Sequence, residues 1–242
     1  SGGRVTATGY NAGIYTYSGT ITLGCTTDTD FIYASRYDVG FEGRLKIAEE
    51  QKLYDEDGTE YSGTLFYDDI PNLDGKTLRS FPYVNVYDSE DNSEAINGSN
   101  GQQRNVFLYG RTLYKDGEWN TLCLPFDVTD GDPDDEISFS GTPLEGATVM
   151  VLDDSSGTGF DASTGVLTLN FSDATEIPAG MPFIIRWGTP DDNPGTTLTD
   201  PVFEGVTIDN SDDAIARKTQ ASTDGTVSFK GTYAKQEYTE EN

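Results

Sequence analysis

The sequence predicts an all-β protein, and three observations support this prediction. Apolar and polar residues alternate in many short runs, which is the pattern of strands that bury one face. Helical periodicity is nearly absent from the chain. Asp-Gly and Asn-Gly pairs, which suit the positive φ angles of tight turns, separate the runs. The 14 Tyr, 12 Phe and 2 Trp supply bulky core residues in a chain that is only 35% hydrophobic.

The individual elements follow from the same pattern. Residues 20–25, 167–171 and 227–233 alternate most clearly and are expected to be strands. Two short segments are helix candidates, Leu45 to Leu53 and residues 210–217. Strand centres recur about every 20 residues, which is compatible with the rungs of a parallel β-helix. An antiparallel β-sandwich with long acidic loops fits this spacing equally well.

The run 111–128 combines two strand-like segments with a turn signal. Asp116-Gly117 suits a tight hairpin turn, so we expect local antiparallel pairing on either side of it. After the turn, apolar residues occupy both alternating sets of positions, which predicts a strand buried on both faces. The first set is Leu122, Leu124 and Phe126, and the second is Trp119, Thr121 and Cys123. Trp119, which follows the turn in this strand, is therefore expected to be structural.

Composition limits the classes of partner. The chain has 242 residues and a formal net charge of −27, which repels nucleic-acid phosphates and anionic membranes. No run of about 18 apolar residues is present, so we expect no transmembrane helix and no membrane insertion. We expect residues 1–242 to form a single all-β module cut from a larger multidomain protein. Cys25 and Cys123 permit one disulfide, and two buried thiols are the alternative.

The absence of histidine removes much of the usual catalytic chemistry. The chain has no histidine, so it lacks Ser-His-Asp and Cys-His arrangements and an imidazole base. It also has no P-loop and no dinucleotide-binding fingerprint. A glycosidase-like carboxylate pair stays open, with Glu42 and Glu204 as the acids flanked most closely by apolar residues. We expect no catalytic activity.

An acidic run offers ligands for calcium. Asp130, Asp132 and Asp134 alternate along residues 130–136, a spacing that lets one loop surround a hard cation. The twelfth position of the run is Gly141, so the run is not an EF-hand. We therefore expect a structural calcium site here, and a solvated acidic loop is the alternative.

Tyrosines among polar residues suggest a surface that binds sugars. Flat aromatic side chains stack on sugar rings, while adjacent polar groups bond the hydroxyls. The first candidate set is Tyr33, Arg36, Tyr37 and Asp38, and the second is Tyr83, Asn85 and Tyr87. On a strand, residues four apart face the same side at a distance of roughly 13 Å, which suits an extended polysaccharide. The alternative is that one or both pairs belong to the core.

Two stretches carry a resemblance to a known group of proteins. Residues 111–126 read Arg-Thr-Leu-Tyr-Lys-Asp-Gly-Glu-Trp-Asn-Thr-Leu-Cys-Leu-Pro-Phe, and residues 179–187 read Ala-Gly-Met-Pro-Phe-Ile-Ile-Arg-Trp. Both resemble landmarks of large β-rich surface and secreted proteins of gut bacteria, over roughly residues 102–234. The resemblance implies a secreted, extracellular or cell-surface module without catalysis, either adhesin-like or carbohydrate-binding. It also implies that Trp119 and Trp187, which lie in these two stretches, are structural.

The Tyr-rich, acidic, short-stranded character is also similar to xylan-binding modules linked to xylanases, some of which are β-helical. This similarity favours the parallel β-helix over the antiparallel sandwich. It further implies a non-catalytic carbohydrate-binding module that binds xylan-like plant cell-wall polysaccharide and targets a covalently linked glycoside hydrolase. A structural or adhesin-like surface module without a sugar site is the alternative, with a role in cell adhesion.

Overall fold

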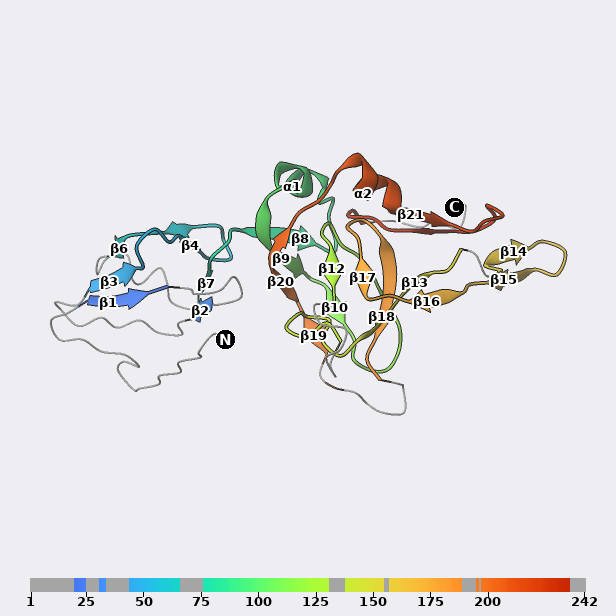
Figure 1. The fold of residues 1–242 in the computed structure, drawn as a ribbon, viewed down its shortest axis with the longest axis horizontal. Coiled ribbons are helices and arrows are strands. Elements are labelled where there is room, and N and C mark those ends of the chain that lie inside the picture. Colours follow the sequence, from blue (N-terminus) through green and yellow to red (C-terminus); the bar gives the residue numbers. More distant parts are fainter. Residues whose placement is uncertain are drawn as a thin grey trace. The chain divides into compact units, whose positions relative to one another are not determined.

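The all-β prediction is confirmed. Strands make up nearly all of the regular structure in the computed structural model, and the described residues contain only two short helices (Figure 1). The structure describes residues 20–24, 31–33, 44–65, 76–130, 138–154, 157–188, 195 and 197–235. Within this part of the chain, neither helix is long and apolar enough to cross a membrane.

The chain divides into two compact units. The first comprises Ser1–Tyr83 with Gln103–Asn105, and the second comprises Val84–Gln102 with Val106–Asn242. The expectation that residues 1–242 form a single module stays a prediction.

The described part of the first unit contains two small sheets. One has the order β1 (Thr20–Leu23), β3 (Arg44–Ile47), β6 (Thr64–Leu65). The other has the order β2 (Phe31–Tyr33), β7 (Thr77–Arg79), β4 (Leu53–Tyr54), β5 (Glu60–Tyr61). β1 and β3 pair in parallel, and the remaining ladders in the described part of this unit are antiparallel.

The helix predicted over Leu45 to Leu53 is wrong. The segment instead contributes β3, a turn at residues 49–50 and the start of β4. Its apolar residues belong to two different strands, so their spacing does not reflect one helical face. Ile47 and Leu53 are both buried, because each strand contributes to the small core of this unit.

A buried carboxylate organises the hairpin between β4 and β5. Asp55 is 1% exposed, and its Oδ1 accepts hydrogen bonds from the backbone N–H groups of Asp57 and Thr59. Tyr61 donates its hydroxyl to Asp55 Oδ2 at 2.9 Å. Burial and this hydrogen bond raise the pKa of Tyr61 to about 12. Gly58 completes the turn with φ 82°, as the Asp-Gly pair predicts.

The second unit is built on two larger sheets. One has the order β20 (Val202–Thr207), β9 (Gln103–Tyr109), β8 (Tyr83–Tyr87). The other has the order β11 (Asn120–Cys123), β18 (Pro182–Arg186), β13 (Thr148–Leu152), β16 (Phe171–Asp173). All three ladders of the four-stranded sheet are antiparallel.

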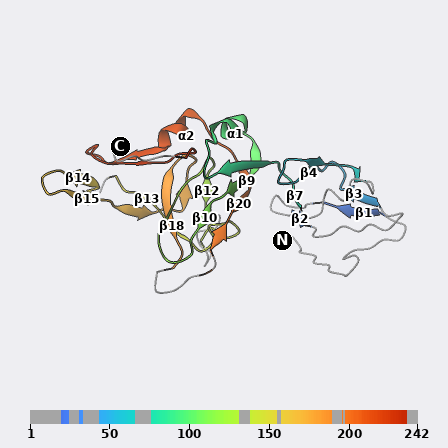
Figure 2. The same cartoon turned by 180° about the vertical axis from the view of Figure 1, so that it is seen from behind.

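Four short antiparallel ladders complete this unit. They are β10 (Thr112–Leu113) with β19 (Leu198–Thr199), β12 (Val128–Thr129) with β17 (Glu176–Ile177), β14 (Gly159–Asp161) with β15 (Val166–Thr168), and β21 (Thr219–Ala221) with β22 (Ser228–Lys230). The β14–β15 and β21–β22 hairpins extend side by side, which Figure 2 shows from behind. Phe160 N donates to Thr226 Oγ1 between them at 2.8 Å.

The hydrophobic core of this unit takes residues from both large sheets. Phe126 and Phe203 lie at its centre, with ring centroids 5.1 Å apart. Leu122, Leu124 and Phe126 are all buried, so the first predicted face of the 111–128 run is confirmed. Ile96 of the short helix α1 (Ser93–Gly98) also enters this core.

The second predicted face of the same run is not buried. Trp119 is 39% exposed, Thr121 is exposed and Cys123 is half-buried. β11 is the end strand of its sheet, so its outer face is only partly covered. The expected burial of this strand on both faces is therefore wrong.

The hairpin predicted around Asp116-Gly117 is also wrong, although the turn forms. Gly117 has φ 84°, but β10 pairs with β19 and β11 pairs with β18. The side chain of Asn120 takes the place of the missing ladder. Its amide accepts from Tyr114 N and donates to Tyr114 O, both at 2.9 Å.

The helical turn predicted at residues 210–217 is confirmed as α2 (Asp212–Arg217). Ser211 caps it, because its hydroxyl accepts from Ala214 N at 3.4 Å. Gly180, at φ 83°, lies against this helix. A Cβ at Gly180 would lie 1.9 Å from the carbonyl oxygen of Ala214, so the close approach requires glycine.

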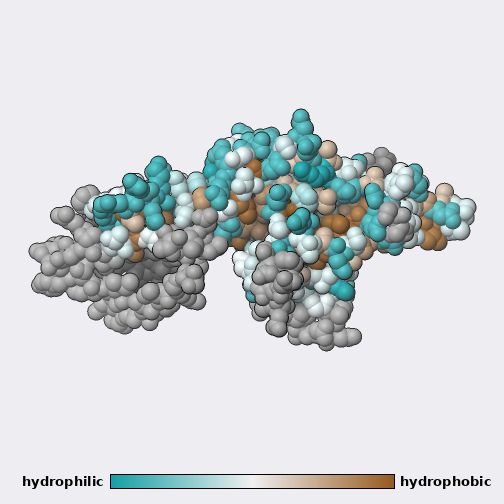
Figure 3. All heavy atoms as spheres, in the orientation of Figure 1, coloured by the Kyte–Doolittle hydropathy of each residue, from teal (hydrophilic) through white to brown (hydrophobic). Residues whose placement is uncertain are grey.

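The strand predicted at residues 167–171 forms as two strands, β15 and β16. Leu167 and Leu169, which the alternation places toward a core, are 55% and 47% exposed. The hairpin β14–β15 thus carries apolar side chains at the surface, as the brown spheres at its tip show in Figure 3. These residues have no second layer to pack on among the described residues.

Candidate functional site

The first predicted tyrosine set lies largely outside the described residues. Tyr33 ends strand β2, where it pairs with Thr77 of β7. Arg36, Tyr37 and Asp38 are not among the residues that the structure describes. The sugar-binding role of this set stays a prediction.

The second predicted set lies on β8. Val84 and Val86 of this strand are turned toward the core, so Asn85 and Tyr87 lie on the opposite face. Tyr83 belongs to the first unit, where its hydroxyl accepts a hydrogen bond from Arg79 Nε at 2.7 Å. Asn85 Nδ2 donates to the hydroxyl of Tyr87 at 3.5 Å. All three are half-buried.

β9 brings further aromatic residues beside Tyr87. Asn105 N donates to Pro82 O near the start of the two strands, and Asp88 N donates to Tyr109 O at their ends. β8 and β9 therefore run parallel, with the segment that contains α1 as their crossover. Val106 and Leu108 are buried, which leaves Phe107 and Tyr109 on the face that carries Tyr87.

These aromatic rings form a compact cluster, which we call the aromatic platform: Tyr87, Phe107 and Tyr109. The ring centroids of Tyr87 and Tyr109 are 5.1 Å apart, and those of Phe107 and Tyr109 are 5.4 Å apart. Tyr109 is 50% exposed. Its neighbours hold the ring from two sides and leave half of its surface to solvent, which is the geometry that stacking on a flat ligand needs.

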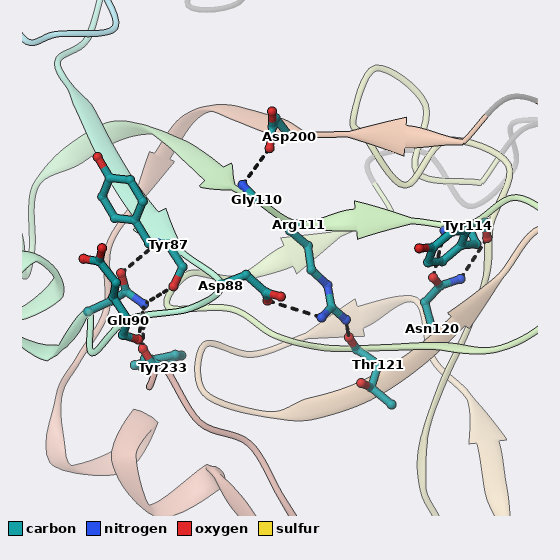
Figure 4. Close-up of polar contacts among 11 residues, drawn as sticks. Tyr87, Asp88, Glu90, Gly110, Arg111, Tyr114, Asn120, Thr121, Asp200 and Tyr233 are labelled. Atoms are coloured by element: carbon teal, nitrogen blue, oxygen red, sulfur yellow. Dashed lines mark hydrogen bonds and ion pairs between the residues drawn. The ribbon is translucent and has the colours of Figure 1, made fainter. Parts of the chain in front are cut away.

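A charged pair borders the platform. Arg111 follows β9, and its Nη1 lies 3.3 Å from Asp88 Oδ1 (Figure 4). Its Nη2 donates to the carbonyl oxygen of Thr121 on β11. The Nε of Arg111 is buried and has no hydrogen-bond partner among the described residues.

The turn that places Arg111 is fixed by Asp200. Gly110 has φ 80°, and its N–H donates to Asp200 Oδ1 at 2.6 Å. The backbone N–H of Asp200 donates to Arg111 O at 2.9 Å. Both bonds hold the chain at the end of β9, so Arg111 leaves the sheet in a defined direction.

A groove of about 380 Å³ opens beside this charged pair. Its lining combines Tyr87, Asp88 and Arg111 with Cys123 and Tyr233. Tyr233 donates its hydroxyl to Leu124 O at 3.2 Å. The groove therefore lies between the end of the three-stranded sheet and the edge strand β11.

Asn92 makes one wall of the groove rigid. Its Nδ2 donates to Tyr233 O at 2.7 Å and to Tyr87 O at 2.9 Å. Its Oδ1 accepts from Tyr87 N at 2.8 Å. This buried side chain joins β8 to the C-terminal segment, so the wall is formed before any ligand binds.

Burial in the groove keeps the Cys123 thiol and the Tyr233 phenol in their neutral forms. Burial raises the pKa of the Cys123 thiol to about 11 and raises the pKa of Tyr233 far above its ordinary value. Burial lowers the pKa of Lys218, whose Nζ lies 3.5 Å from the centroid of the Tyr233 ring. A protonated thiol and a protonated phenol are poor nucleophiles and poor bases.

Cys123 is a free thiol, and Cys25 lies outside the described residues. The disulfide alternative is therefore not realised for Cys123. Gly231 packs directly on this thiol, since a Cβ there would lie 2.3 Å from Cys123 Sγ.

The predicted calcium site is described only at its first residue. Asp130 Oδ1 accepts from Phe139 N at 3.0 Å, and Asp132 and Asp134 lie outside the described residues. Within the described ranges, no group of three or more candidate ligand side chains is placed to hold a metal ion. Calcium binding by residues 130–136 stays a prediction. Of the two acids considered for a carboxylate pair, Glu42 is not described and Glu204 is half-buried on β20.

The two tryptophans differ in their surroundings. Trp187 is 4% exposed, and its Nε1 donates to Glu145 O at 2.8 Å, so its expected structural role is confirmed. Trp119 lies at the surface with the guanidinium carbon of Arg186 4.5 Å from its ring centroid. Trp119 is thus exposed, as Tyr109, Tyr114 and Phe160 are, contrary to its expected place in the core.

Sequence reasoning found Tyr87 and missed Phe107, Tyr109 and Arg111. The alternation of Phe107 and Tyr109 with Val106 and Leu108 was a usable signal for a strand with one aromatic face. The pairing with β8 was not visible, because it depends on a parallel crossover through a helix of six residues.

Comparison with known protein families, with curated proteins and with solved structures finds no match to this chain. The resemblance to β-rich proteins of gut bacteria and to xylan-binding modules therefore stays an expectation from the sequence.

Proposed function

We propose that this protein is a non-catalytic carbohydrate-binding module that binds xylan-like plant cell-wall polysaccharide. The observation that carries the proposal is the half-exposed ring of Tyr109, held by Tyr87 and Phe107 beside the pair of Asp88 and Arg111. Aromatic rings stack on the C–H faces of sugars, and the charged pair supplies donors and acceptors for hydroxyl groups.

Binding of this kind is passive. The platform is preformed by sheet pairing, so little ordering is needed when a sugar docks. Each contact is weak, but tethering to a linked glycoside hydrolase raises the effective concentration of enzyme at the polymer. The module would then act outside the cell or at its surface, where the polysaccharide is found.

For the architecture, we propose the antiparallel sandwich over the parallel β-helix for the second unit. Antiparallel ladders throughout the four-stranded sheet support this choice, whereas a β-helix stacks its rungs in parallel. Both large sheets also contribute to one core, as the two layers of a sandwich do.

The proposal is tested by affinity electrophoresis against xylan, β-glucan and mannan, using wild type, Tyr109→Ala and Tyr114→Ala. Retardation by xylan is expected for wild type. Tyr109→Ala should weaken binding by about 1–3 kcal/mol, the scale of stacking on an aromatic side chain. Tyr114 is 55% exposed but lies outside the platform, so Tyr114→Ala is the matched control and should bind like wild type.

Two results would contradict the proposal. Absence of retardation on every polysaccharide would remove the binding function. Equal binding by Tyr109→Ala and wild type would place the sugar site elsewhere.

The second candidate function is a structural or adhesin-like surface module without a sugar site. The exposed apolar side chains of the β14–β15 hairpin favour it, because such residues are common where proteins contact one another. A chain that binds no polysaccharide but shows concentration-dependent self-association, lost on Leu167→Lys, would support this candidate.

A further inference from the structure

The groove beside the aromatic platform gathers positive charge in a strongly acidic chain. The whole chain has 15 Lys and Arg against 42 Asp and Glu. Yet the described residues that line the groove include Arg111, Lys230 and Lys235 and only one carboxylate, Asp88. Lys218 adds a further cation against the ring of Tyr233, which lines the same groove. The charge balance of the groove is therefore opposite to that of the chain.

The guanidinium of Arg111 has N–H donors that its contacts with Asp88 and Thr121 do not use. A guanidinium carries five N–H donors in a planar fork that matches a carboxylate. Arg111 contacts Asp88 and Thr121 O through Nη1 and Nη2, and its Nε has no partner among the described residues. The Nε atom is buried, so the donors left for a ligand are the remaining N–H groups of Nη1 and Nη2 on this side chain, which is 27% exposed. Lys230 is exposed on β22 and lines the same groove.

The size of the groove suits a single sugar unit. Its volume of about 380 Å³ falls at the lower end of the range for small-ligand sites. Tyr87 belongs to both the platform and the groove lining, so the two features adjoin. A glycan chain lying on Tyr109 would present its branches to the groove.

We infer that this groove binds the carboxylate of a uronic acid branch on the polysaccharide, with Arg111 and Lys230 as its cationic partners. This inference rests on the proposed function, because the platform holds the backbone that carries the branch. The negative charge of the rest of the chain opposes approach at long range. That repulsion is screened beyond about 8 Å at physiological ionic strength, whereas contacts inside the groove are not.

The test compares three xylo-oligosaccharides by isothermal titration calorimetry: an unbranched one, one with a glucuronic acid branch, and the same branched one after reduction of its carboxyl group. Wild type should bind the acidic ligand about tenfold more tightly than the other two, the effect of one hydrogen bond to a charged group. A sulfated xylo-oligosaccharide is added as a fourth ligand, because its sulfate group carries the same charge as the carboxylate in a different geometry. Sulfate binding as tight as that of uronate would overturn the assignment to a carboxylate.

Substitutions in the groove test whether its cations cause the preference for the acidic ligand. Lys230→Gln should remove most of the preference for the acidic ligand and leave binding of the unbranched ligand unchanged. Arg111→Gln should also remove the preference, but it should weaken binding of the unbranched ligand as well, because Arg111 borders the platform. Lys230 is exposed, so its replacement keeps the test valid if Arg111→Gln does not fold. Lys52→Gln, an exposed lysine of the first unit, is the matched control and should keep the preference.

The outcomes separate the two proposals. Equal affinity of wild type for all three ligands overturns the inference and leaves the proposed function standing. Binding of only the acidic ligand, lost in Lys230→Gln, supports the groove and contradicts the platform. Failure of all three ligands to bind overturns both.

Discussion

At the scale of single residues, glycines with similar φ angles differ in what an added side chain would contact. Gly180 combines a positive φ with a backbone contact to α2, whereas Gly141 has a similar φ of 76° and no atom within 4 Å of the place where a Cβ would lie. A comparison of alanine substitutions at the two positions therefore separates the free-energy cost of backbone strain from that of a steric clash.

We expect Gly180→Ala to lower the free energy of unfolding by much more than Gly141→Ala. Gly141→Ala should cost about 1–2 kcal/mol, the strain of a left-handed alanine. Gly180→Ala adds a contact of 1.9 Å with the carbonyl oxygen of Ala214, which must push α2 away. Urea denaturation of both variants measures the difference, and equal losses would show that α2 does not pack as described.

The Cys123 thiol gives a prediction for alkaline pH. Its pKa rises from the ordinary 9.0 to about 11 because burial disfavours the thiolate. The folded state thus holds its proton more tightly than the unfolded state does. The resulting stability is fully present below pH 9 and is lost as the pH rises through about 11.

The measurement is the rate of alkylation by iodoacetamide in a Cys25→Ser background, so that only Cys123 reacts. The rate in the native protein should stay low at pH 9 and rise toward pH 11, whereas the urea-unfolded chain should react readily at pH 9. Identical pH profiles for native and unfolded chains would contradict the burial of this thiol.

At the scale of elements, Asn120 replaces a hairpin ladder with one side chain. Asn120→Ala would leave the N–H and C=O of Tyr114 without the partners they have in the structure. We expect a loss of about 1–3 kcal/mol in the free energy of unfolding. Thr121→Ala, at the exposed neighbouring position, is the matched control and should change stability little.

Thermal or urea unfolding of both variants checks this prediction. If Asn120→Ala and Thr121→Ala are equally stable, then water replaces the amide without cost and Asn120 does not hold the 114–120 loop.

A strand could be predicted from the sequence where the alternation of apolar and polar residues lay within that one strand. Alternation located β1 and the buried face of β11, and the run 210–217 was correctly expected to contain a helical turn, α2. Pairing was not predictable, because β10 and β11 take partners about 60 to 90 residues away, as their registers with β18 and β19 show. The failed helix at Leu45 to Leu53 has the same cause, since its apolar residues serve two strands.

In the candidate site too, local patterns were predictable and strand pairing was not. Tyr87 stood out among polar neighbours in the sequence, whereas Tyr109 joins it only through the parallel pairing of β8 and β9. The helix in their crossover buries a single residue, Ile96, so its sequence has no helical periodicity from which the helix could be predicted. Trp119 was assigned to a buried strand, but it lies just before the edge strand β11 and is 39% exposed.

At the scale of the whole molecule, charge and aromatic exposure are unevenly distributed. A chain with a net charge of −27 concentrates cations in one groove, and that groove adjoins its aromatic platform. Both features lie in the second unit, which also contains the larger hydrophobic core. A rigid core beneath a preformed polar and aromatic surface is what passive recognition of a polymer requires.

We propose that Tyr109 and its neighbours form the surface that binds the polysaccharide. A crystal structure of the protein soaked with a xylo-oligosaccharide is the decisive test. We expect a sugar ring stacked on Tyr109 at about 3.5–4.0 Å, with hydroxyl groups bonded to Asp88 or Arg111. A sugar ordered on Trp119 and Arg186 with none on Tyr109 would contradict it.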